Sequence, residues 1–406
     1  VPRSERRALT SMLARPLGLA VAVGLGYALG SKLSYWWFNA NGLNATFFPA
    51  AGVTLAALVL SPRRSWAFVL AGAATAEVSL NLWHGIDPGP TLGYALANGV
   101  ESLVGASLLL ALAPRPDLER LRDLVLFLAC AVVAAPAVGG TIGATNFVLS
   151  AEGSWLEFAR DWWVGDGLGV LVVGAAVLAV GRAWPAPGGR LRPVETAAFA
   201  AAVSAATAVV FWAEEPVLAF LPFAILLVAA VRLGTAAVAI SGSLAAILAA
   251  QATADGHVFW ETLEIASQTG LLYLQLLVAF VVVTPLLLAA ALRSRDVAVA
   301  ELFSVQRREA LAAASAALAA ANTEQEVVDA FVAVGRMRLG AARGLVALDG
   351  GDELVVRYPA DAPEAWGGRS ARARRSPAGD ALQSGHRVGA APPEALRSRY
   401  PELAAE

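Results

Sequence analysis

Residues 265–292 read IASQTGLLYLQLLVAFVVVTPLLLAAAL, a stretch without a single charged side chain. A helix needs roughly 20 predominantly apolar residues to cross the hydrocarbon core of a bilayer, and this stretch is long enough to do so. It ends at Arg293, where the sequence becomes polar again. The stretch therefore predicts a membrane-spanning helix.

Similar apolar stretches recur along the rest of the chain. Of its 406 residues, 57% are hydrophobic and 15% are charged, whereas soluble domains have about 45–50% and about 25%. We therefore predict an all-α polytopic membrane bundle with about ten spans. Two of the ten, at 46–60 and 216–231, are short, so eight spans is the alternative. The remaining spans are predicted at 12–31, 66–83, 92–113, 121–150, 161–181, 194–213 and 234–254.

Arginine alternates between the loops of this ten-span arrangement. Lys and Arg accumulate in cytoplasmic loops, and here every second loop carries arginine, from Arg63 after the second span to Arg293 after the tenth. The intervening loops are acidic and hold only Lys32 and Arg160 as Lys or Arg. We therefore expect a multi-pass membrane protein with both termini in the cytoplasm. The richness in Arg and Ala suggests a GC-rich bacterial genome, so the expected location is the bacterial inner membrane.

Polar side chains lie inside several predicted spans, where a charge costs at least about 2.5–3.5 kcal/mol unless it faces a cavity or a partner. The topology puts all of them in the outer half of the membrane, which predicts a pocket open to the outside for a small molecule or an ion. The candidate ligand-binding residues are Glu77, Asn81, Asn98, Glu101, Thr145, Trp162, Trp163 and Asp166.

Spacing and charge give this prediction more detail. Glu77 and Asn81 are four residues apart, and Asn98 and Glu101 are three apart, so each pair shares one helix face. Two adjacent buried carboxylates resist double ionisation, so Glu77 and Glu101 are expected to share a proton or to bind a cation. The alternative is structural, because Asn and Thr side chains also cross-link membrane helices at about 0.6 kcal/mol each.

The sequence predicts no catalytic residues, no metal site and no cofactor. Cys130 is the only cysteine, and the chain has three histidines, which leaves no clustered nucleophile or metal-ligand motif. We also expect no nucleic-acid partner. The glycines within 139–143 and 165–169 are predicted to let helices approach closely.

Five short segments stand out in order along the chain: 48–52 (FPAAG), 97–101 (ANGVE), 141–145 (TIGAT), 162–169 (WWVGDGLG) and 232–234 (RLG). Together they resemble the bacterial membrane-associated sensor domain of the MASE type, first class, over about residues 10–295. The resemblance implies a sensory input module joined to an output such as a histidine kinase, a diguanylate cyclase or a serine phosphatase. Two positions depart from the family pattern: Phe48 stands where Trp is expected, and Glu77 where Asn is frequent.

The tail predicts a small α+β domain in the cytoplasm. We divide the chain into an integral membrane sensor domain (1–295), a signalling helix or linker (296–321) and a partial GAF-like domain (322–406). Thr323-Glu324-Gln325-Glu326 has the pattern of a capping box at the start of a helix. Strands are expected at 344–348 and 354–358, and a further helix at 377–384. The order resembles the first two thirds of a GAF domain, so we expect a fragment or a truncated gene product.

A bacterial sensory receptor is the leading functional prediction. Its expected partners are the lipid bilayer, an unknown small ligand, and either a second copy of the chain or a membrane partner protein. A membrane transporter is the alternative, because polar groups inside the membrane and Gly- or Pro-interrupted helices suit it as well. We see no inverted repeat between residues 1–150 and 151–292. A membrane-embedded enzyme is the third reading, and no catalytic constellation supports it.

Overall fold

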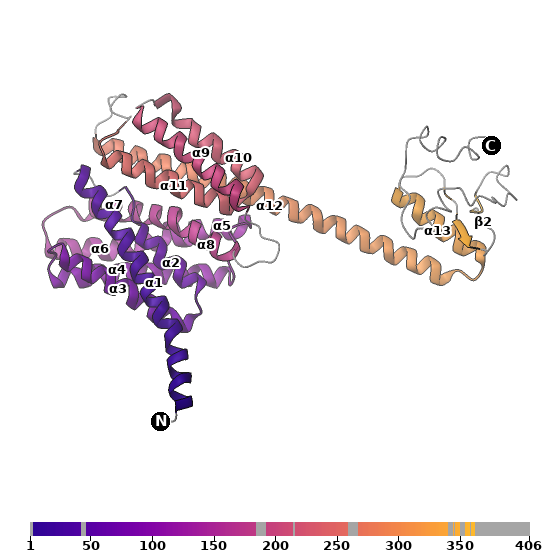
Figure 1. Ribbon diagram of the computed structural model, residues 1–406, viewed down its shortest axis with the longest axis horizontal. Coiled ribbons are helices and arrows are strands. Elements are labelled where there is room, and N and C mark those ends of the chain that lie inside the picture. The colour runs from indigo at the N-terminus through magenta and orange to yellow at the C-terminus, as the bar shows by residue number, and fades with distance from the viewer. Residues whose placement is uncertain are drawn as a thin grey trace. The chain divides into compact units, whose positions relative to one another are not determined.

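The computed structural model describes residues 3–41, 46–183, 192–213, 216–258 and 267–339, and in the tail 344, 346–349, 354–357 and 359–361. The chain divides into two units, Val1–Val297 and Ala298–Glu406. Nearly all described elements are helices (Figure 1).

The first unit contains the helices α1 to α11 and the first part of α12. Those that reach the site described below are α1 (Arg3–Asn41), α2 (Pro49–Leu60), α3 (Trp66–Trp83), α4 (Pro88–Leu112), α7 (Trp155–Gly169) and α12 (Ser267–Ala320). The others are η1 (Arg63–Ser65), α5 (Leu121–Phe127), η2 (Leu128–Ala134), α6 (Ala135–Ser150), η3 (Val170–Gly174), α8 (Ala175–Ala183), α9 (Pro193–Trp212), η4 (Pro216–Ala219), α10 (Phe220–Leu233) and α11 (Thr235–Ala254).

Each of the ten predicted spans falls on a helix or on two or three consecutive helical segments. Seven described helices are long and apolar enough to cross a membrane, and the apolar helices Pro49–Leu60 and Val217–Leu233 are shorter. The third predicted span corresponds to α3, which is 18 residues long and carries Glu77 and Asn81. The chain is thus a multi-pass membrane protein with an all-α bundle, while the number of spans stays a prediction.

Proline and glycine mark several helix boundaries. Pro49, Pro88 and Pro193 stand in the first turn of α2, α4 and α9, where the missing N–H of proline has no helical partner to lose. Gly234 connects α10 to α11 with a φ of 88°, a conformation that other residues adopt at a cost.

The first unit has two groups of helices. Figure 1 shows α9 to α12 side by side, next to the group formed by α1 to α8. α11 connects the groups because it packs against α9 and α10 as well as against α1 and α8. The short helix α2 lies inside the first group, in contact with α1, α3, α4, α7 and η3, and most of its residues are buried.

Two helices each contain a π-helical segment, η2 and η3, and side chains from other helices bond their carbonyl groups. Trp163 Nε1 donates to the backbone oxygen of Val133 at 2.9 Å, and Ser243 Oγ donates to that of Val172 at 2.6 Å. Such segments interrupt the regular hydrogen-bond ladder and occur often near functional sites. Beside η3, a Cβ at Gly52 would meet the backbone oxygen of Gly169, so α2 and α7 touch backbone to backbone.

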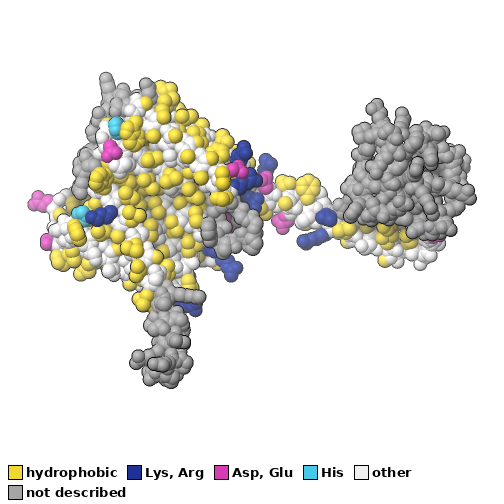
Figure 2. All heavy atoms as spheres, in the orientation of Figure 1, with side chains coloured by type: hydrophobic (Ala, Val, Ile, Leu, Met, Phe, Trp, Pro, Cys, Tyr) yellow, Lys and Arg dark blue, Asp and Glu magenta, His cyan; other side chains and the backbone are white. Residues whose placement is uncertain are grey.

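The surface of the bundle has the character expected for a membrane protein. Figure 2 shows hydrophobic side chains over most of the visible face, with Lys and Arg gathered mainly at one end. On α1, Leu17, Val21, Leu25 and Leu29 form a stripe with exposures of 54–69%. Soluble monomers rarely expose so much contiguous apolar surface, so lipid is the natural cover.

The described part of the second unit begins within α12 and continues with α13 (Glu324–Leu339). The predicted capping box is confirmed: Thr323 Oγ accepts from the Glu326 N–H, and Glu326 Oε2 accepts from the Thr323 N–H, both at 3.2 Å. Strands β1 (Val346–Asp349) and β2 (Leu354–Arg357) pair antiparallel. The helix expected at 377–384 lies outside the described residues, so the GAF-like domain and the domain limits stay predictions.

Candidate functional site

A cavity of about 380 Å³ lies among α1, α3, α4, α7 and the segment that precedes α2. This volume is within the range of about 300–1,000 Å³ that is typical of small-molecule sites. The lining combines polar and aromatic side chains. The polar members are Ser31, Ser34, Tyr35, Glu77, Asn81, Asn98, Asp161 and Asp166, and the aromatic ones are Tyr35, Phe47, Phe48, Tyr94, Phe158 and Trp162.

The polar residues of α3 reach the cavity because they extend its buried stripe. The buried positions of this helix are Val69, Ala73, Glu77 and Asn81, four residues apart in each case, so they share one face. Buried polar groups need hydrogen-bond partners, and both are bonded. Asn98 Nδ2 donates to Glu77 Oε1 at 2.7 Å, and the Tyr35 hydroxyl donates to Asn81 Oδ1 at 2.7 Å.

Glu101 lies behind this wall and is only 1% exposed. Trp162 Nε1 donates to Glu101 Oε2 at 2.9 Å, and Asp166 is a direct neighbour of Glu101. Among the described residues, neither Glu101 Oε1 nor Asp166 Oδ2 accepts from an N–H or hydroxyl group, and the two carboxyl groups lie against each other. Two buried carboxyl oxygens without donors are costly, so this part of the site is set up to receive a proton or a positively charged donor.

Glycines on α6 make room for this pair. A Cβ at Gly139 would overlap Glu101 Oε2, and a Cβ at Gly143 would approach the Trp162 ring to 2.7 Å. The predicted role of these glycines in close helix packing is therefore confirmed. Larger side chains at these positions would displace the carboxylate and the indole that bonds it.

Aromatic rings form one wall of the cavity. The ring centroids of Tyr94, Phe158 and Trp162 are 6.0–6.1 Å apart, and Phe147 stacks on Phe158 from behind at 4.4 Å. These separations are typical of interacting aromatic pairs. The wall offers ring faces both to apolar groups and to cations.

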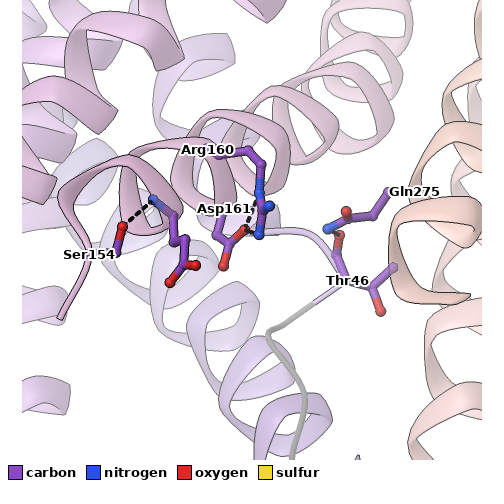
Figure 3. A network of polar contacts seen from close by, with 6 residues as sticks. Thr46, Ser154, Arg160, Asp161 and Gln275 are labelled. Carbon is purple, nitrogen blue, oxygen red and sulfur yellow. Dashed lines mark hydrogen bonds and ion pairs between the residues drawn. The ribbon is translucent and has the colours of Figure 1, made fainter. Parts of the chain in front are cut away.

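One ion pair stands where α7 enters the cavity (Figure 3). Arg160 Nη2 is 2.8 Å from Asp161 Oδ1, and Asp161 lines the cavity. The helix that carries both is capped by Ser154, whose Oγ accepts from the Glu157 N–H at 3.4 Å. The charge of Asp161 is therefore balanced locally, unlike that of the deeper carboxyl groups.

Helix α12 is bonded to the segment that forms another side of the cavity. Gln275 Nε2 donates to the backbone oxygen of Thr46 at 3.0 Å (Figure 3), and the following residues, Phe47 and Phe48, line the cavity. Ser34 Oγ donates to the backbone oxygen of Phe47 at 3.2 Å. The cavity wall and α12 are thus connected through one buried amide side chain.

Of the candidate residues, the cavity brings together Glu77, Asn81, Asn98, Trp162 and Asp166, with Glu101 bonded to Trp162 behind them. Thr145 and Trp163 lie elsewhere. Thr145 is exposed and accepts from Trp155 Nε1, and Trp163 is 42% exposed and bonds η2.

Sequence reasoning missed Tyr35, Tyr94 and Phe158. Only their aromatic character marked them, and the same character is common among residues at the lipid interface. The described residues contain no group of three or more His, Cys, Asp and Glu side chains that could hold a metal ion.

Comparison with protein-family models matches residues 15–296 to MASE1. Comparisons with curated proteins and with solved structures gave no match. MASE1 is a membrane-associated sensory domain of signalling proteins and serves as an input domain, not a catalytic one. The match covers well over half of the 406 residues, and it confirms the resemblance that the five sequence segments indicated. The chain belongs to the MASE1 family.

Proposed function

We propose that the chain is the sensory input module of a bacterial receptor in the inner membrane, and that the cavity binds the small ligand that is sensed. Membership of the MASE1 family supports a sensory role. Buried polar side chains around a cavity of about 380 Å³ support a ligand site, because such groups are costly in a membrane unless they have a function or a partner. The arginine distribution favours a cavity in the outer half of the membrane.

The contact between Gln275 and Thr46 is the observation that carries the proposal. A ligand against Phe47 or Phe48 displaces the segment that includes Thr46, and the 3.0 Å bond passes this displacement to α12. The same helix continues to Ala320. A ligand shifts a conformational equilibrium only when it binds one of the two states more tightly. In this proposal the two states differ in the position of the Thr46 segment, and the hydrogen bond to Gln275 couples that position to α12. In this scheme a GAF-like segment at 322–406 passes the signal to an output domain.

The proposal can be tested by filling the cavity chemically, without knowledge of the natural ligand. Ile86 lines the cavity and is half-buried, so Ile86→Cys in a Cys130→Ala background can be modified with a small methanethiosulfonate reagent. The readout is hydrogen exchange of backbone amides over residues 293–320, measured on the full chain in lipid nanodiscs. Ser150→Cys, an exposed position outside the cavity lining, is the matched control.

We expect modification at Ile86→Cys to change exchange over residues 293–320, and modification at Ser150→Cys to leave it unchanged. Adding Gln275→Leu should suppress the change, because leucine fills a similar volume without donating to Thr46. Equal exchange before and after modification at Ile86→Cys would contradict the proposed relay.

A further inference from the structure

We propose that the cavity selects a small protonated amine that carries an apolar group. This inference rests on the proposed function for its biological consequence and deepens it by naming the class of ligand. Three features of the lining lead to it: acidic side chains with no basic one among the described residues, a buried carboxyl pair without an N–H donor, and an aromatic wall.

The titratable side chains of the lining are acidic, apart from its tyrosines. Glu77, Asp161 and Asp166 contribute carboxyl groups, and among the described lining residues there is no Lys, Arg or His. Arg160 balances Asp161 at 2.8 Å, which leaves Glu77 and Asp166 without a cationic partner in the described part of the chain. An anionic ligand would add like charge in a medium of low dielectric, whereas a cation compensates it.

One oxygen of the lining lacks a hydrogen-bond donor. Asp166 is 5% exposed and lies against the carboxyl group of Glu101, and its Oδ2 accepts from no N–H or hydroxyl group among the described residues. Two facing buried carboxyl groups without a donor are costly unless they share a proton, and a ligand N–H would supply the missing donor. This requirement separates a protonated amine from a quaternary ammonium ion, which has the same charge and no N–H to donate. Glu77 Oε1, by contrast, already accepts from Asn98 at 2.7 Å.

The aromatic wall suits both parts of such a ligand. The faces of the Tyr94, Phe158 and Trp162 rings, with centroids 6.0–6.1 Å apart, attract an ammonium group within about 6 Å of a ring centroid. The same rings pack against an apolar group. A bare metal ion fits less well, since about 380 Å³ far exceeds the space one ion needs and the described residues contain no metal-binding cluster.

The test compares four probes on the purified full chain in nanodiscs: 2-phenylethylamine, the neutral 2-phenylethanol, the trimethylammonium analogue of the amine, and sodium chloride. Binding is followed by isothermal titration and by tryptophan fluorescence.

We expect the amine to bind about 10- to 100-fold more tightly than the alcohol, as a charged hydrogen bond in a buried site implies. The quaternary analogue should bind more weakly than the amine, and sodium should not compete. Equal binding of the amine and the alcohol overturns the proposal, and equal binding of the two cations overturns the requirement for an N–H donor.

Variants assign the binding to the cavity. Asp166→Asn and Glu77→Gln should each weaken binding of 2-phenylethylamine at least about tenfold. Asp123→Asn should not, because Asp123 is equally buried at 5% exposure but lies on α5, outside the cavity lining. Two substitutions keep the test decisive if one protein fails to fold. Undiminished binding in a folded Asp166→Asn or Glu77→Gln protein contradicts the proposed site.

The outcome is separable from that of the proposed function. If the amine binds but hydrogen exchange over residues 293–320 does not change, the ligand class stands and the relay fails. If modification at Ile86→Cys changes that exchange while 2-phenylethylamine does not bind, the sensory role stands and the ligand class is wrong.

Discussion

Trp162→Phe removes one hydrogen bond from the most deeply buried carboxyl group of the site. The indole Nε1 donates to Glu101 Oε2 at 2.9 Å. Glu101 is 1% exposed, and its other oxygen accepts from no N–H or hydroxyl group among the described residues. Phenylalanine keeps an aromatic ring at the position but has no N–H, so the substitution isolates the loss of the donor.

The neighbouring Trp163 provides the matched control. Its Nε1 also donates at 2.9 Å, but to the neutral backbone oxygen of Val133, and the residue is 42% exposed. Leaving a buried acceptor without its donor costs about 1–3 kcal/mol, whereas side-chain hydrogen bonds in membrane proteins average about 0.6 kcal/mol. Trp162→Phe should therefore lower the free energy of unfolding by about 1–3 kcal/mol and Trp163→Phe by about 0.6 kcal/mol.

The assay is unfolding by titration with sodium dodecyl sulfate in mixed micelles, followed by circular dichroism. A double-mutant cycle separates the hydrogen bond from the lost ring area. In a Glu101→Leu background the acceptor is absent, so Trp162→Phe should cost only the contribution of the lost ring area. The reasoning is refuted if Trp162→Phe costs the same in both backgrounds, because the indole would then contribute through packing alone.

Two further predictions concern packing and topology. Gly139→Ala should lower the thermal midpoint, since a Cβ there overlaps Glu101 Oε2 and overpacking costs about 1–3 kcal/mol. A Cβ at Gly99 would meet nothing within 4 Å, so Gly99→Ala should be neutral or stabilise the protein by up to about 1 kcal/mol. Equal thermal midpoints for the Gly139→Ala and Gly99→Ala proteins would contradict the steric argument. Reporter fusions at Gly85 should score as external and those at Gly351 as cytoplasmic, and an external score at Gly351 would exclude the predicted orientation.

The approximate positions of the helices could be predicted from the sequence because long apolar runs are typical of membrane-spanning helices. The span predicted at 121–150 matches the helix Leu121–Ser150. The one predicted at 161–181 begins too late, since its helix starts at Trp155. Residues 155–160 read WLEFAR, which is too polar to resemble a span. Their helical start depends on the Ser154 cap, which a search for apolar runs overlooks.

The site was partly predictable for an energetic reason. A carboxylate within an apolar run is conspicuous, and Glu77 and Asp166 indeed line one cavity. The direction of a side chain around its helix is harder to predict. Trp162 and Trp163 are consecutive, so they point about 100° apart, and only the first faces the cavity. Nothing in the local sequence distinguishes them, because the difference arises from where α6 packs against α7.

The contacts around the deep end of the cavity argue for a sensor over a transporter. Alternating access needs one group of helices to rock against another around the binding site. Here the Phe48 N–H donates to the Gly165 oxygen at 2.9 Å, and Gly52 and Gly169 leave no room between α2 and α7. Opening a path through this side would break backbone contacts that no side-chain motion can replace. In the proposed relay, a small displacement of Thr46 would reach Gln275 through their 3.0 Å hydrogen bond without opening such a path. These contacts therefore favour the proposed relay along α12 over passage of a ligand through the bundle.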